Sequence, residues 1–73
     1  MQPYKNAGPK PSGVIAYELG TEEIIVQFVD GNFYRYSYAS AGKTLVEQMK
    51  RLAAAGQGLS TFISQHNPAH EIY

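Results

Sequence analysis

The sequence predicts an α+β fold in which a three-stranded antiparallel β-meander is followed by two helices packed on one face of the sheet (β-β-β-α-α). Two observations lead to this fold class. Three short segments rich in β-branched and aromatic residues lie in the first half of the chain, and an amphipathic pattern with a helical period follows them. A sheet with one apolar face needs a second layer, which two helices can supply.

The three expected strands are 14–19 (VIAYEL), 24–29 (IIVQFV) and 33–38 (FYRYSY). The first two are separated by Gly-Thr-Glu-Glu, which is a plausible turn. The second and third are separated by Asp30-Gly31-Asn32, and glycine and asparagine tolerate the positive φ angles that tight hairpins need. We therefore expect consecutive strands to pair as hairpins.

A three-residue loop at 30–32 predicts the register of the second hairpin. The expected partners are Phe28 with Tyr34, Val26 with Tyr36, and Ile24 with Tyr38. Cross-strand partners share a face of the sheet, so these six side chains should line one side. Ile15, Tyr17 and Leu19 could extend the same face. The opposite face would carry Ile25, Val29 and Phe33.

The helical pattern begins after the third strand. Its apolar stripe consists of Leu45, Met49 and Leu52, with Val46 and Ala53 beside them. Ser40 is the expected N-cap, and Gly56 is the expected end of the helix. A second, short helix is expected within 58–67, where Leu59, Phe62 and Ile63 would face inward and Pro68 would end it.

The chain is predicted to form one domain, because 73 residues are too few for two. Residues 1–13 contain three prolines and two glycines and are expected to be a flexible arm. The folded domain would then span residues 14–67, and residues 68–73 would be a loose tail. A domain of this size gains buried area by self-association, so a homo-oligomer is a possible state.

Composition and charge restrict the classes of function. Six Lys and Arg balance six Asp and Glu, so the chain lacks the basic surplus typical of general nucleic-acid affinity, and such binding would need a local patch. No apolar run approaches a membrane span, and the first residues do not resemble a secretory signal. The expected location is therefore the cytoplasm, with which the absence of cysteine is compatible.

The pattern resembles the KTSC domain, a short module found at the C-terminus of some lysyl-tRNA synthetases and alone in small bacterial and phage proteins. The resemblance covers residues 14–67. It rests on Phe28 with Gly31, on Tyr34 with Tyr36, and on GQGLSTFI at 56–63. Many members carry Val-Pro where this chain has Ala39-Ser40. The family has no established activity, and its place beside a tRNA-charging enzyme implies RNA binding as an expectation.

Gly42-Lys43-Thr44 is the first candidate motif. A P-loop would require a glycine five positions before Gly42, where Ser37 stands, and the chain is too short for the parallel sheet of such proteins. A weaker possibility is that Lys43 and Thr44 help to hold a phosphate at a helix N-terminus.

Tyr34, Tyr36 and Tyr38 recur at a spacing of two and so share a face. On an open sheet such rings can stack on unpaired bases while Arg and Lys hold the backbone. Alternatively the three rings pack beneath the helices, and their expected pairing with apolar partners favours this core interpretation.

The sequence therefore predicts a small non-catalytic binding module whose ligand is RNA or a phosphate-bearing nucleotide. The candidate ligand contacts are Arg35, Tyr36, Lys43, Thr44, Lys50 and Arg51. One alternative is a protein-interaction or self-assembly module that uses Ile25, Val29 and Phe33; another is a small oligomer that captures a free nucleotide between subunits. No cofactor is expected, and no metal, because Pro68 separates His66 from His70.

Overall fold

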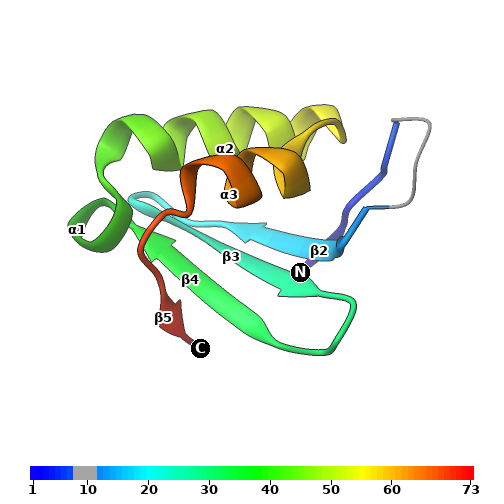
Figure 1. The fold of residues 1–73 in the computed structure, drawn as a ribbon, viewed down its shortest axis with the longest axis horizontal. Coiled ribbons are helices and arrows are strands. Elements are labelled where there is room, and N and C mark those ends of the chain that lie inside the picture. The colour runs from blue at the N-terminus through cyan, green and yellow to red at the C-terminus, as the bar shows by residue number, and fades with distance from the viewer. Residues whose placement is uncertain (8–11) are drawn as a thin grey trace.

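The computed structural model describes residues 1–7 and 12–73, and within them one antiparallel sheet carries helices on one face (Figure 1). The strands follow each other in chain order across the sheet. They are β1 (Gln2–Pro3), β2 (Val14–Leu19), β3 (Glu23–Phe28), β4 (Phe33–Ser37) and β5 (Glu71–Ile72). The helices are α1 (Tyr38–Ala41), α2 (Lys43–Ala55) and α3 (Leu59–His66).

The α+β class with an antiparallel sheet is confirmed, but the expected number of three strands is wrong, because the described sheet has five. The two additional strands come from the segments expected to be an arm and a tail. β1 pairs with β2, and β5 pairs with β4. Each has only two residues, too few to show the alternation by which strands are recognised in a sequence. Residues 8–11 of the expected arm lie outside the described residues.

The hairpin between β3 and β4 has a different register from the one predicted. Val26 lies opposite Tyr34 and Ile24 opposite Tyr36, which shifts the expected partners by two positions. The loop closes one residue earlier than expected, because Phe28 both donates and accepts a hydrogen bond across the turn. Its N–H donates to the Asn32 carbonyl at 3.0 Å, and its carbonyl accepts from the Gly31 N–H at 2.9 Å.

A shift of two residues keeps every side chain on its predicted face, since side chains alternate along a strand. Ile24, Val26 and Tyr36 are accordingly buried on the helix side, as predicted. Tyr38 was expected to continue this strand but is instead the first residue of α1.

The register of β2 against β3 is irregular between Val14 and Ala16. Val14 and Tyr17 are buried, whereas Ile15 and Leu19, which were expected on the apolar face, are exposed. A bulge changes which residues of a strand point to the core, and an alternating pattern does not reveal it.

The predicted N-cap of the amphipathic helix, Ser40, is wrong, because α2 has Gly42 at its N-cap and Ser40 lies within the short helix α1. Helix α1 is itself capped by Ser37. The Ser37 hydroxyl accepts from the Ser40 N–H at 3.2 Å, and the Ser40 hydroxyl accepts from the Ser37 N–H at 3.0 Å, which forms a capping box. Gly56 ends α2 in a left-handed conformation, as predicted. Among the described residues, no helix is both long and apolar enough to cross a bilayer.

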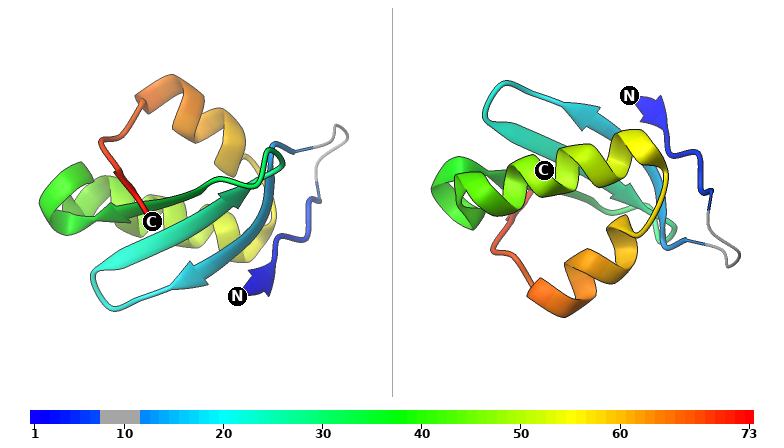
Figure 2. Two further views of the ribbon diagram at one scale, coloured as in Figure 1. Left: turned by 90° about the horizontal axis from the view of Figure 1, so that it is seen from below. Right: turned by 90° about the horizontal axis from the view of Figure 1, so that it is seen from above.

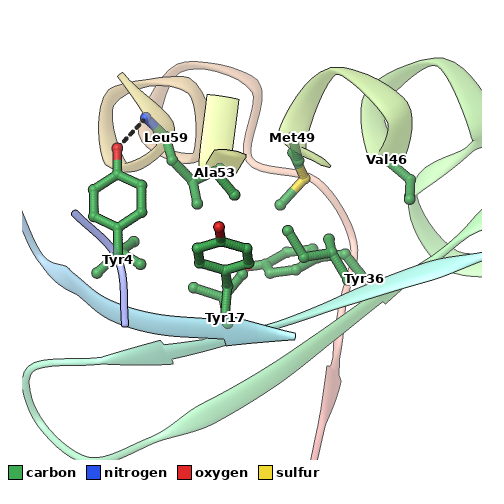
Figure 3. Packing of buried hydrophobic residues seen from close by; sticks show 10 residues of the cluster. Tyr4, Tyr17, Tyr36, Val46, Met49, Ala53 and Leu59 are labelled. Carbon is green, nitrogen blue, oxygen red and sulfur yellow. Dashed lines mark hydrogen bonds between the residues drawn. The ribbon is translucent and has the colours of Figure 1, made fainter. Parts of the chain in front are cut away.

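The core lies between the sheet and helices α2 and α3 (Figures 1 and 3). Helix α2 contributes Val46, Met49 and Ala53, and α3 contributes Leu59. An unpredicted member is Tyr4, which is buried and whose hydroxyl accepts a hydrogen bond from the Leu59 N–H at 3.4 Å (Figure 3). The segment 1–7, called the N-terminal segment below, therefore contributes to the core.

Candidate binding surfaces

The six predicted ligand contacts do not form one site. Tyr36 is 1% exposed and belongs to the core, so the prediction that it stacks on a base is wrong. Burial, with a smaller contribution from nearby Tyr34, raises the pKa of Tyr36 to about 12. The core interpretation of the tyrosines is thus correct for Tyr36, while Tyr34 and Tyr38 pack at the border of the core.

Arg35 points to the face of the sheet that carries no helix, because its neighbours Tyr34 and Tyr36 point to the core. Its Nε and one terminal nitrogen both lie 2.7 Å from Glu23 Oε1. Arg35 therefore lies across the sheet from the cations of α2, and its charge is paired with a carboxylate.

Lys43 and Thr44 are exposed at the start of α2. The N-cap of this helix is Gly42, which has no side chain to bond the first N–H groups. Arg51 is exposed two turns further along. These three residues are accessible to a ligand, but none of them lines the groove described below.

Lys50 connects α2 to the loop between β2 and β3. Its Nζ donates to the Thr21 carbonyl at 2.9 Å and lies 3.1 Å from Glu47 Oε2. The Tyr38 hydroxyl donates to the same carboxylate oxygen at 2.5 Å, and these two hydrogen bonds lower the pKa of Glu47. The hydrogen bond to Glu47 raises the pKa of Tyr38. Lys50 therefore has a structural role, and its charge is shared with Glu47.

Of the predicted self-association residues, Ile25 and Phe33 lie on the helix-free face, whereas Val29 lies in the loop between β3 and β4. Ile25 is only 3% exposed, although it lies outside the main core cluster. The prediction that Ile25 is available for self-association is therefore wrong. Val29 is 66% exposed in the hairpin loop, and Phe33 is partly exposed at the start of β4.

A groove that sequence reasoning missed lies between the N-terminal segment and α2. Its volume is about 400 Å³, and it is lined by Gln2, Pro3, Lys5, Tyr17, Ala53 and Ala54. This volume falls within the range of small-molecule sites, about 300–1,000 Å³. Half of the lining comes from the segment expected to be flexible, and no pattern in so short a stretch indicates that it folds against a helix.

The lining of this groove is apolar at its base and polar at its rim. Tyr17 and Ala53 are buried and form the apolar part, while Gln2 and Lys5 are exposed. Among the lining residues that the structure describes, Lys5 is the only one with a formal charge. Such a surface suits a ligand that combines an apolar or planar part with a negative charge.

The two histidines contact different parts of the molecule. The His66 ring stacks on Phe62 with centroids 4.1 Å apart, and the His70 ring lies 4.3 Å from that of Tyr34. His70 thereby covers β4 just before β5 begins.

Comparison of the sequence and the structure with known proteins finds no matching family model, no similar curated protein and no similar solved structure.

Proposed function

We propose that the protein is a small non-catalytic binding module that holds a phosphate-bearing nucleotide, free or as part of an RNA, in the groove between the N-terminal segment and α2. The observation that carries this proposal is the groove itself, which combines an apolar base with Lys5 at its rim. The resemblance to the KTSC domain and a cytoplasmic location belong to the same proposal.

The charges of the two faces support this position for an anionic ligand. Helix α2 carries Lys43, Lys50 and Arg51 against the single acid Glu47. The helix-free face carries Glu18, Glu23 and Glu71 around Arg35, and this excess of carboxylates repels phosphate. A phosphate-bearing ligand is therefore expected on the helix side.

The chemistry of the lining suits a nucleotide better than inorganic phosphate alone. Lys5 would pair with the phosphate as a point charge. The side chains of Tyr17 and Ala53 offer apolar contact to a base, and the Gln2 amide can donate to and accept from its edge. The proposal assigns no catalytic residue.

The experiment is a titration of the full chain with adenosine monophosphate and, separately, with a short oligouridylate, followed by NMR of the backbone amides. We expect shifts at Lys5, Tyr17 and Ala54, and an affinity that falls with salt because an ion pair forms. Inorganic phosphate alone should bind more weakly, since it leaves the apolar base unfilled.

Two neighbouring alanines provide a matched pair of variants. Ala54 lines the groove, whereas Ala55 does not, and both are exposed in the last turn of α2. Ala54→Glu should weaken binding at least about tenfold, equivalent to about 1.4 kcal/mol. Ala55→Glu should not, although it places the same charge on the same helix turn. Equal affinities for the two variants, or shifts confined to other residues, would exclude this groove.

A further inference from the structure

The N-terminal segment lies along the outer edge of the sheet, beside β2 and the C-terminal end of α2, in both views of Figure 2. Within residues 1–7, all of which the structure describes, only Tyr4 is buried. Its ring lies in the core cluster, edge-to-face with Tyr17 at 6.4 Å, and its hydroxyl accepts from the Leu59 N–H at 3.4 Å. The segment is thus held by one aromatic anchor, as many short peptides are held by the proteins that bind them.

The backbone of the segment is held as a strand added to β2. β1 pairs antiparallel with β2, and beyond β1 the Tyr4 N–H donates to the Ile15 carbonyl at 2.9 Å. The Ala7 N–H donates to the Gly56 carbonyl at 2.6 Å. Both acceptors keep their positions without the segment, because β2 also pairs with β3 and α2 packs on the sheet. Addition of an extended strand to a sheet edge is a general mode of peptide recognition.

The position of Pro3 shows what this edge requires of a peptide. The N–H groups of an antiparallel edge strand alternate between the partner strand and solvent. Since the Tyr4 N–H donates to β2, the N–H that Pro3 lacks would point away from β2. Proline therefore costs no hydrogen bond to the sheet here, and it prevents a further strand from pairing outside. The tyrosine, in contrast, needs its N–H.

Gly56 lets a peptide backbone pass close to the end of α2. A Cβ at this position would overlap the Lys5 carbonyl oxygen, so the segment passes directly against the glycine. The left-handed conformation of Gly56 also ends the helix, so one residue both stops α2 and leaves room for the peptide.

We propose that the edge of β2 and the C-terminal end of α2 form a binding site for an extended peptide of another molecule that carries a tyrosine anchor. The N-terminal segment is then an intramolecular ligand, which fills the site until such a peptide displaces it. A peptide fits this site better than a nucleic acid, because the Ile15 and Gly56 carbonyls match backbone N–H groups and repel phosphate. Peptide binding here does not depend on the proposed nucleotide binding and can be measured without a nucleotide.

Competition with the N-terminal segment sets the affinity for a separate peptide. Burial of Tyr4, offset by the entropy of ordering the segment, favours the docked state by about tenfold. A short tether gives an effective concentration of about 1 mM, so a separate peptide with the same residues is expected to bind the empty site with a Kd of about 0.1 mM. The docked segment raises the apparent Kd about tenfold, to about 1 mM in the wild type.

An NMR titration of the full chain with the peptide MQPYKNA, the sequence of residues 1–7, tests this competition. Tyr4→Ala removes the anchor from the tethered segment and leaves the site intact, so this variant should bind the peptide about tenfold more tightly than the wild type, with shifts at the Leu59 and Gly56 amides. In the wild type, the amides of the chain's own Tyr4 and Ala7 should move toward their positions in an unfolded chain. Circular dichroism checks that the variant is folded, and if it is not, the wild-type titration decides.

Gly56→Ala is the matched control for Tyr4→Ala, because it also releases the segment but blocks the site with a Cβ. It should not bind the peptide. In the peptide, alanine in place of tyrosine, or a methyl group on the tyrosine nitrogen, should weaken binding at least about tenfold, whereas alanine in place of proline should not. The proposal is overturned by a folded chain that shows no shifts with up to about 5 mM peptide, by equal binding of the tyrosine and alanine peptides, or by equal binding to the Gly56→Ala and Tyr4→Ala variants.

Discussion

Replacing Gly56 by alanine tests whether the N-terminal segment belongs to the folded core. Gly56 ends α2 with φ 67° and ψ 32°, a left-handed conformation that costs alanine about 1–2 kcal/mol. The added Cβ would also overlap the Lys5 carbonyl oxygen and lie 2.9 Å from its carbonyl carbon. Backbone atoms cannot rotate away as the end of a side chain can, so we expect the N-terminal segment to leave its place.

The cost of displacing this segment follows from what it contributes. Tyr4 leaves the core, and burial of a large side chain is worth about 1.5–3 kcal/mol. The hydrogen bond from the Leu59 N–H to the Tyr4 hydroxyl adds about 1 kcal/mol. The freed residues regain conformational entropy, which offsets much of this loss and leaves a net cost of about 1–2 kcal/mol. Together with the backbone strain, Gly56→Ala should lower the free energy of unfolding by about 3 kcal/mol.

Gly58→Ala is the control for backbone strain alone. Gly58 also has a left-handed conformation, with φ 78°, but an added Cβ would meet nothing within 4 Å. The Gly58→Ala variant should lower the free energy of unfolding, measured by urea denaturation, by only about 1–2 kcal/mol. The reasoning is refuted if the two variants lose the same stability.

A double-mutant cycle makes the same test independent of strain. Tyr4→Ala should destabilise the wild type but have little further effect in the Gly56→Ala variant, because the tyrosine has already left the core there. Equal costs in both backgrounds would show that the N-terminal segment stays bound. Displacement should also abolish nucleotide binding, since Gln2, Pro3 and Lys5 form one wall of the groove.

Three further predictions concern the core and its caps. The pKa of Tyr36 is raised from 10.0 to about 12, so its contribution to stability, about 3 kcal/mol, is complete below pH 10 and is lost as the pH rises through 12. An absorbance titration in which all six tyrosines ionise together near pH 10 in the folded protein would contradict this. Ser37→Ala removes the capping box of α1 and should lower the free energy of unfolding by about 1 kcal/mol. An unchanged midpoint of urea denaturation would contradict this prediction. Tyr34→Ala removes a half-buried ring that contacts Phe28 and His70 and should cost about 3 kcal/mol, whereas Tyr73→Ala at low protein concentration should leave the melting temperature unchanged.

The elements with long, periodic patterns were predictable from the sequence, and the two-residue strands were not. β2 to β4 and the helices α2 and α3 each present several apolar residues at a regular spacing, so their existence follows from periodicity. The buried faces of β4, α2 and α3 follow in the same way, but the irregular register of β2 buries Val14 and leaves Ile15 and Leu19 exposed. β1 and β5 are strands only because the edges of β2 and β4 offer hydrogen-bond partners. This is a property of the folded sheet and not of their own residues.

The candidate sites were predictable to a smaller extent, for the same reason. The exposed cations Lys43 and Arg51 and the exposed Phe33 lie within the well-predicted elements. The groove depends on Lys5, which lies in the N-terminal segment, whose folding could not be predicted from the sequence. The prediction of Tyr36 as a ligand contact was wrong because an aromatic residue in a strand is equally compatible with a buried core and with an exposed stacking surface.

The contact between Tyr4 and Leu59 also determines the order in which the molecule can be completed. These residues are 55 positions apart, whereas the hairpins β2–β3 and β3–β4 join neighbours in the sequence. Contacts between distant residues require the closure of long loops and form late. During synthesis, the strands β2 to β4 can therefore pair before α3 has been made, whereas Tyr4 cannot contact Leu59 until then. The segment that holds Lys5 already has partners in β2, because β1 pairs with β2 and the Tyr4 N–H donates to the Ile15 carbonyl. The groove is complete only when α2 adds Ala53 and Ala54, so a chain stalled before α2 would have a sheet before it had a binding groove.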